Sequence, residues 1–233
     1  MKTPFRIMVM SGLITAAVCA VVLGQAEALK THVASIKASL AQNQQNLKHY
    51  QWNETTAVLM NGEEKSRKVY QVHYGPDGTI QKTEVMATPE KHARGVRGHI
   101  MEKKKEEMTE EMKRAMEIVK QYVPPDPARI QAAMNSGNAS VHMAEPGKKV
   151  SLTFRNYQMP GDQLTLEFDP STRHILGANV ATYMDDPKNP VDLVVQFGTL
   201  PDGTTHPSQS TLNLKSKNLT VVTTNSNYTK LTE

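Results

Sequence analysis

Histidines and acidic residues are the side chains of this sequence best suited to metal binding or acid–base chemistry. Its eight histidines are scattered: His92 and His99 are seven residues apart, and no HExxH pair occurs. Asp185 and Asp186 offer oxygen ligands of the kind that calcium takes, but a proline follows them, and a polar turn explains them equally well. The sequence therefore predicts no metal site and no cofactor.

Residues for nucleophilic catalysis or phosphate binding are also missing from the pattern. There is no GxSxG or SxxK motif, and GVRG at 95–98 has neither the length nor the lysine of a phosphate-binding loop. The one cysteine, Cys19, lies in the apolar leader. We predict no catalytic residues and a protein that is not an enzyme, although two distant carboxylates brought together by the fold would escape this reading.

A methionine stripe is the most distinctive spacing in the chain. In EEMTEEMKRAMEIVKQYV (106–123), Met108, Met112 and Met116 recur at intervals of four residues and share one side of a helix with Val119. One interpretation is that this side packs on a sheet, as any surface helix requires. The other is that it lines a binding wall, because unbranched, polarisable methionine adapts to apolar chains of varied shape.

The first 28 residues have the order of a secretory signal peptide. Lys2 and Arg6 precede an apolar run from 7 to 24, and Ala26 and Ala28 form a small-residue cleavage site. An uncleaved membrane anchor is the alternative, because the run is almost long enough to span a bilayer. We expect cleavage, a periplasmic location and one domain over 29–233 that contains no cysteine and is held by its core alone.

Hydrophobic periodicity predicts the elements of that domain. Apolar residues at helical spacing over 29–47 predict a first helix, and 88–137 reads as a helical insert with an N-cap at Asp126 and a C-terminal cap at Gly137. Alternating residues between turn clusters predict nine strands, over 50–60, 68–74, 79–86, 150–154, 163–168, 174–183, 191–197, 210–214 and 219–224. Helices in two blocks, not alternating with strands, favour an α+β fold with an antiparallel sheet.

The charge of the chain is modestly positive, at +4 with a pI near 9.0. The densest basic run, KKK at 103–105, lies beside glutamates. A solvated helix surface explains this pattern, so no nucleic-acid partner is predicted.

The order of these elements, and phrases such as VHYGPDGTIQK and VVQFGTLPDGTTHPSQSTLNLKSKNLTVV, resembles the periplasmic lipoprotein-carrier and outer-membrane lipoprotein-sorting superfamily. The resemblance implies a strongly curved, open half-barrel of antiparallel strands with helices covering its concave face. No functional residue of the carriers can be matched to a position here. The helical insert is longer and more charged than a simple lid requires.

Three functions follow as hypotheses. The first is an exported, monomeric carrier for a lipid or a lipoprotein acyl chain, with ligand-binding residues Trp52, Val58, Met108, Met112, Met116, Val119 and Ile130. The second is an envelope interaction module with a packed core, no ligand and a protein partner. The third is an enzyme acting on envelope polymers, which would require carboxylates or histidines to converge in a cleft.

Overall fold

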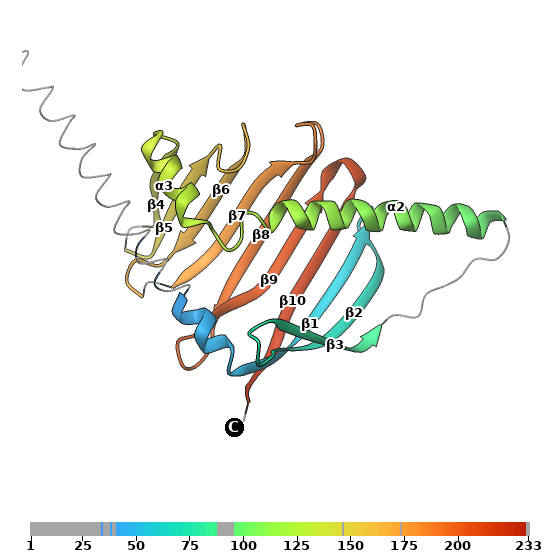
Figure 1. Cartoon of the computed structure of the whole chain (residues 1–233), viewed down its shortest axis with the longest axis horizontal. Coiled ribbons are helices and arrows are strands. Elements are labelled where there is room, and N and C mark those ends of the chain that lie inside the picture. Colours follow the sequence, from blue (N-terminus) through green and yellow to red (C-terminus); the bar gives the residue numbers. More distant parts are fainter. Residues whose placement is uncertain are drawn as a thin grey trace, which may run out of the picture.

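The computed structural model describes residues 34, 38, 41–87, 96–145, 147–172 and 174–231. The predicted signal peptide and most of the predicted first helix lie outside the described residues. Ten strands form one antiparallel sheet in the order β3-β2-β1-β10-β9-β8-β7-β6-β5-β4 (Figure 1). They are β1 (Tyr50–Met60), β2 (Glu63–Tyr74), β3 (Ile80–Ala87), β4 (Ala139–Glu145), β5 (Lys149–Arg155), β6 (Gln163–Phe168), β7 (Ile175–Tyr183), β8 (Pro190–Thr199), β9 (Thr205–Leu214) and β10 (Leu219–Lys230).

The sheet is open, with β3 and β4 as its two edges. Nearly all neighbouring strands follow each other in the chain, as in a meander. The exception is the pairing of β10 with β1, which joins the last strand to the first. The prediction of an antiparallel α+β fold is confirmed at this level.

The two faces of the sheet differ in polarity because side chains alternate along each strand. On β5, Val150, Leu152 and Phe154 are buried, whereas the intervening Ser151 and Thr153 are half-buried on the opposite face. Directly opposed residues of an antiparallel pair share a face, so the register extends this division from strand to strand. One face is therefore apolar and the other is rich in Ser, Thr, Asn and Gln.

Turn residues follow the predicted chemistry. Asn61 and Gly62 join β1 to β2 with φ angles of 52° and 80°, as a tight hairpin of this sequence requires. The turn after β2 ends at Gly78, whose φ is 76°. Both turns were predicted from the sequence and are confirmed.

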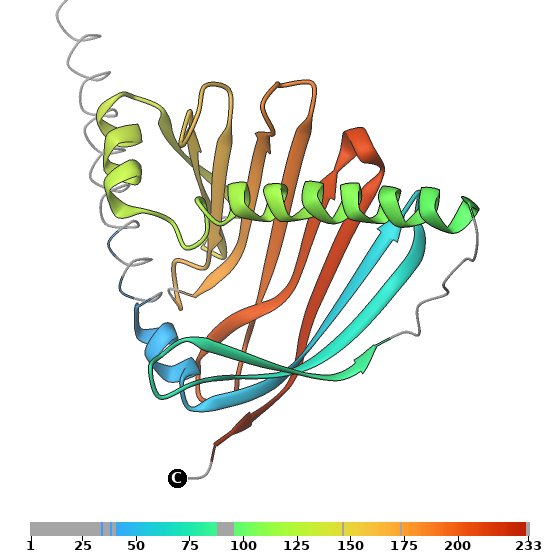
Figure 2. The same cartoon turned by 45° about the vertical axis from the view of Figure 1, so that its right-hand side comes forward.

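Two helices connect β3 to β4. Helix α2 (Val96–Val119) lies across the apolar face, and its first turns extend past the β1–β2 side of the sheet (Figures 1 and 2). Helix α3 (Pro127–Asn135) begins where the Asp126 side chain accepts a hydrogen bond from Ala128 N at 2.8 Å. The predicted cap at Asp126 is confirmed, and Gly137 follows α3 with a φ of 73°.

The main core lies between α2, α3 and the apolar face. Its buried members are Ala115, Val119, Tyr122, Ile130, Ala133, Val150, Leu152, Phe154, Tyr157, Leu164, Leu166, Phe168, Ala178, Val180, Met184, Val191, Leu193, Val195, Leu212, Leu214, Leu219 and Val221. They come from both helices and from strands β5 to β10. The sheet and its helices therefore share one interior.

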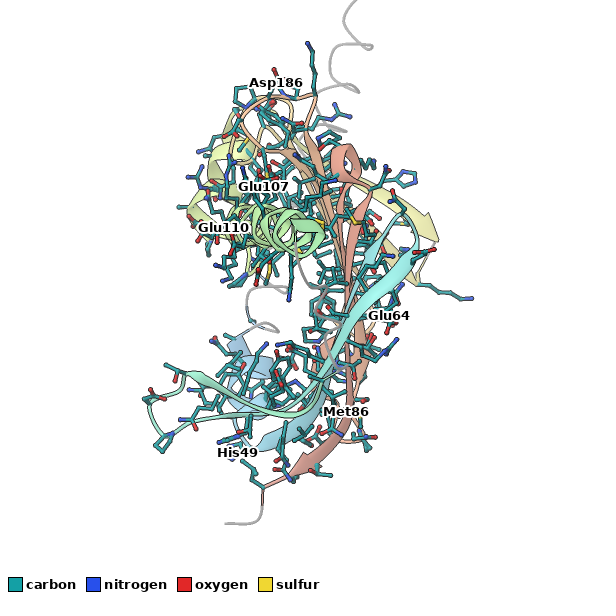
Figure 3. All side chains as sticks on the ribbon, turned by 90° about the vertical axis from the view of Figure 1, so that its right-hand side faces the viewer. His49, Glu64, Met86, Glu107, Glu110 and Asp186 are labelled. Carbon is teal, nitrogen blue, oxygen red and sulfur yellow. The ribbon has the colours of Figure 1, made fainter. Side chains whose placement is uncertain are left out.

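A short helical segment, residues 41–47, lies beside the start of β9. Asn43 is buried, and its Oδ1 accepts a hydrogen bond from Thr205 N at 2.9 Å. Asn46 Nδ2 donates to Thr204 Oγ1 at 3.1 Å. The β2–β3 hairpin bends toward the side of the sheet that carries this helix and α2 (Figure 3).

The structure corrects four strand predictions. Strand β4 was missed, and β10 continues six residues beyond the predicted end at 224. Strand β2 begins at Glu63 instead of 68, and β9 begins at Thr205 instead of 210. Strand β3 is exposed along its whole length, so the expected apolar side of this strand is not buried. Among the helices of the described ranges, none has the length and hydrophobicity needed to cross a membrane.

Candidate functional site

The methionine stripe lies against the main core, but its members are buried to different degrees. Ala115 and Val119 are fully or almost fully buried, and Met108 and Met112 are partly buried against the core. Met116 is 43% exposed. Somewhat more than half of the Met116 surface is therefore covered, so this residue lies at the edge of the buried stripe and the expectation that it is packed holds only in part.

The other predicted ligand-binding residues fall into two places. Val58 packs partly buried against the main core, and Ile130 of α3 is buried within it. Trp52 is buried outside that core, in a different group of side chains. The structure thus places five of the seven residues in or against the main core, leaves Met116 exposed at its edge and separates Trp52 from them.

Ion pairs hold one flank of α2. Glu111 lies 3.3 Å from Lys217 in the β9–β10 turn, and Arg114 contacts Asp185 in the β7–β8 turn. Helical spacing places Met112 and Met116 on the opposite flank from these two residues. We call Met112 and Met116 the methionine flank.

The segment after α2 is tied to the sheet by a buried hydrogen-bond network. Asp162 Oδ2 accepts hydrogen bonds from Tyr122 OH at 2.5 Å and from Gln158 N and Met159 N, both at 2.9 Å. Thr182 Oγ1 is 2.8 Å from the same tyrosine hydroxyl. Burial, followed by the hydrogen bond to Asp162, raises the pKa of Tyr122. The network fixes the segment that follows α2 on the sheet.

A second group of side chains, the aromatic cluster, lies near residues 41–47. It comprises Tyr50, Trp52, Tyr74, His206 and Tyr228. Trp52 and Tyr228 stack with centroids 5.4 Å apart and planes 15° apart, and the His206 and Tyr228 rings lie 4.1 Å apart. Asn227, with a φ of 55°, marks the bulge of β10 that turns Tyr228 toward Trp52.

A polar strip separates the aromatic cluster from the main core on the same face. It consists of Glu54, Thr56, Lys82, Thr223 and Asn225. Glu54 opposes Asn225, and Thr56 opposes Thr223, one step along the face from the core pair Val58 and Val221. Lys82 Nζ donates to both carboxylate oxygens of Glu54, at 2.6 and 2.7 Å.

Burial governs the ionisation of the aromatic cluster. It raises the pKa of Tyr228, with smaller contributions from Tyr74 and Glu54, and it lowers the pKa of His206. His206 is therefore neutral near pH 7, with Nδ1 placed 3.1 Å from the Pro207 carbonyl oxygen. At the margin, Asp202 has a lowered pKa because Tyr50 OH donates to it at 2.6 Å.

Across the apolar face of the sheet, the polar strip therefore lies between the main core and the aromatic cluster. The methionine flank belongs to α2, which packs on that core. A shallow, open hollow lies on the charged outer side of α2 and is lined by Lys103, Glu106, Glu107, Glu110, Glu111 and Arg114. Glu110 points away from the sheet there (Figure 3). Within the described ranges, no three His, Asp or Glu side chains are grouped as metal ligands would be.

The polar strip and most of the aromatic cluster were not predicted from the sequence. Tyr228 and Asn225 lie beyond the predicted end of the last strand, and His206 lies before the predicted start of the preceding one. The segment TTNSNYTK (223–230) carries few apolar residues, so it gives only a weak signal that the last strand continues.

No family model matches this sequence, and no curated protein matches it significantly. Among solved structures, a DUF1329 family protein from Desulfovibrio piger aligns with 87% of this chain and 92% of its own chain. The identity is 7% and the TM-score is 0.39. At that level the similarity assigns neither a family nor an activity to this chain.

Proposed function

We propose that this protein is a non-enzymatic binding protein for an apolar chain, such as the acyl chain of a lipid or lipoprotein. The observation that carries the proposal is Met116: a large apolar side chain, 43% exposed, on the flank of α2 that no described ion pair holds. It lies one turn from Met112, which packs partly buried against the main core. An apolar chain laid along this flank would continue the surface of the core.

The attachment of α2 favours such a role. Its ion pairs on the held flank use side chains that are partly or largely exposed, and pairs of this kind contribute only about 0–1 kcal/mol each. Small Ala115 and flexible methionines form much of its contact with the sheet. We expect the helix to tilt about the held flank and admit a chain beneath the methionine flank, acting as a lid over the concave side of the sheet.

Native mass spectrometry of residues 29–233, purified gently from the periplasm, tests the proposal. We expect added mass that matches a lipid, and loss of that mass in Met116→Lys, because a lysine there places a charge against the apolar chain. Met143→Lys is the matched control, since Met143 is 58% exposed on the edge strand β4. A bare chain mass for the unmodified protein, with no uptake of added lipid, would contradict the proposal.

Export is part of the proposal and rests on the leader sequence. We expect the mature protein to begin after Ala28 and to occur in the periplasm as a monomer. The intact mass of the protein recovered from a periplasmic extract distinguishes the cleaved form from an anchored one.

A protein-docking role is the second candidate, and edge strand β3 favours it. Ile80, Val85 and Met86 are 51%, 57% and 65% exposed on a strand with one free edge. An extended segment of an envelope protein could add to this edge by backbone pairing. Recovery of one stoichiometric protein and no lipid would favour this candidate over the first.

A further inference from the structure

Two buried polar atoms of the apolar face have no hydrogen-bond partner among the described residues. They are the indole Nε1 of Trp52 and the amide Oδ1 of Asn225. Trp52 is 7% exposed. Unpaired buried polar atoms are uncommon in folded proteins, and each calls for an explanation, such as an ordered water or a group supplied by a ligand.

The two atoms belong to neighbouring positions. Asn225 opposes Glu54 across the β1–β10 pair, and Glu54 is two residues from Trp52 on the same face. The amide orientation of Asn225 is defined, because its Nδ2 donates to the Pro207 carbonyl at 3.0 Å. A donor and an acceptor are thus left unsatisfied on adjacent strands, beside a stacked tryptophan and tyrosine.

The chemistry of the pair restricts what can fill it. An indole N–H only donates, and an amide oxygen only accepts. A single group that satisfies both must accept one hydrogen bond and donate another, as a hydroxyl does. An ionised carboxylate cannot donate, and it would also lie near Glu54; an ammonium group cannot accept.

The neighbouring polar groups already have partners. Glu54 is bound twice by Lys82, and Thr56 Oγ1 is 3.4 Å from Thr223 Oγ1. The two atoms therefore call for one neutral group that both accepts and donates a hydrogen bond, which a water molecule or a ligand hydroxyl can supply.

We infer that the polar strip and Trp52 bind a hydroxyl of a neutral headgroup, of the glycerol or sugar type, whose apolar tail lies along the methionine flank. This rests on the proposed function and names its ligand class as a hydroxylated amphiphile instead of a free fatty acid. The layout of the face supports it: Thr56 of the strip is two residues from Val58, which packs against the core.

Trp52 is the only tryptophan, so its fluorescence reports this site directly. The probes are 1-monodecanoylglycerol and methyl decanoate, both below micelle formation. Both probes carry a decanoyl chain, but methyl decanoate has no hydroxyl group. We expect calorimetry to give about tenfold tighter binding of the glyceride, the scale of a lost hydrogen bond with a buried partner, and only the glyceride to shift Trp52 emission.

In Asn225→Ala, the affinities for 1-monodecanoylglycerol and methyl decanoate should be about equal. Asn213→Ala is the matched control, because Asn213 is a half-buried asparagine on the opposite face and should keep the preference. Trp52→Phe, read by calorimetry, gives a second test that removes the N–H and keeps an aromatic ring.

The outcomes separate the two claims. Equal affinity for both probes, with both weakened by Met116→Lys, would overturn the headgroup site and leave the acyl-binding function standing. No binding of either probe would overturn both. A preference that survives both Asn225→Ala and Trp52→Phe would place the hydroxyl elsewhere and overturn this inference.

Discussion

The hydroxyl of Tyr122 lies 2.5 Å from Oδ2 of Asp162, and this bond joins the segment after α2 to the β5–β6 turn. Both residues are buried, at 0% and 2% exposure. The same carboxylate also accepts three backbone hydrogen bonds, from residues 157, 158 and 159. The position of α2 on the sheet therefore depends on a polar contact as well as on apolar packing.

Tyr122→Phe should lower the free energy of unfolding by about 1.5–3 kcal/mol, because it removes a buried hydrogen bond to a charged group. Urea denaturation measures the change. Tyr183→Phe is the control: its hydroxyl donates to the Pro160 carbonyl at an exposed site, and its loss should cost less than about 0.5 kcal/mol. Equal effects of the two substitutions would show that the network does not anchor α2.

Ala115→Leu should destabilise the protein by about 1–3 kcal/mol, because Ala115 is fully buried between α2 and the sheet and a larger side chain overfills that contact. Glu117→Leu, at an exposed position of the same helix, should have little effect. Thermal and urea unfolding give both values. A neutral Ala115→Leu would mean that α2 can lift from the sheet at little cost.

His206 should make stability depend on pH in the weakly acidic range. Burial lowers its pKa below the ordinary 6.5, so below about pH 6.5 the unfolded chain binds a proton that the folded chain does not. The free energy of unfolding should therefore fall as the pH drops from 7 toward 5. His206→Gln should flatten this slope in urea titrations at several pH values, and an unchanged slope would assign it to other groups.

At protein concentrations far above those at which the monomer is expected, the exposed apolar residues of β3 should drive self-association through the edge that no described strand pairs with. Val85→Lys combined with Met86→Lys should weaken any concentration-dependent association, because charges on an edge strand oppose pairing with another chain. Sedimentation velocity measures the association, with Met143→Lys on the other edge strand as the comparison. Association that persists in the double variant would exclude this edge as the contact.

Local patterns predicted the fold better than the site. Asn61-Gly62 and the alternation of VSLTF and QLTLEF encode turns and half-buried strands directly, so these elements were predictable. Strand β4 was missed although Ala139, Val141 and Met143 alternate with Ser140 and His142, so the sequence did carry a signal for this short edge strand. The methionine stripe was predictable as a stripe, but the sequence does not show which edge of the stripe stays exposed, and Met116 is 43% exposed.

The polar strip and the aromatic cluster depend on pairing between distant segments. Trp52 meets Tyr228 only because β10 pairs with β1, and a bulge at Asn227 sets the direction of the tyrosine. Backbone pairing of this kind has no local signature in either strand. The site residues that sequence reasoning missed are those that the long-range register brings together.

The place of β10 between β1 and β9 has a consequence for how the protein folds. Without β10, the sheet order leaves β1 to β3 and β4 to β9 as separate pieces, each with an additional unpaired edge. Pairing between such distant segments is slow, and both edges stay open to other chains until it occurs. Pairing of β10 with β1 therefore joins the two pieces of the sheet. The same pairing brings together the residues of the aromatic cluster and of the polar strip.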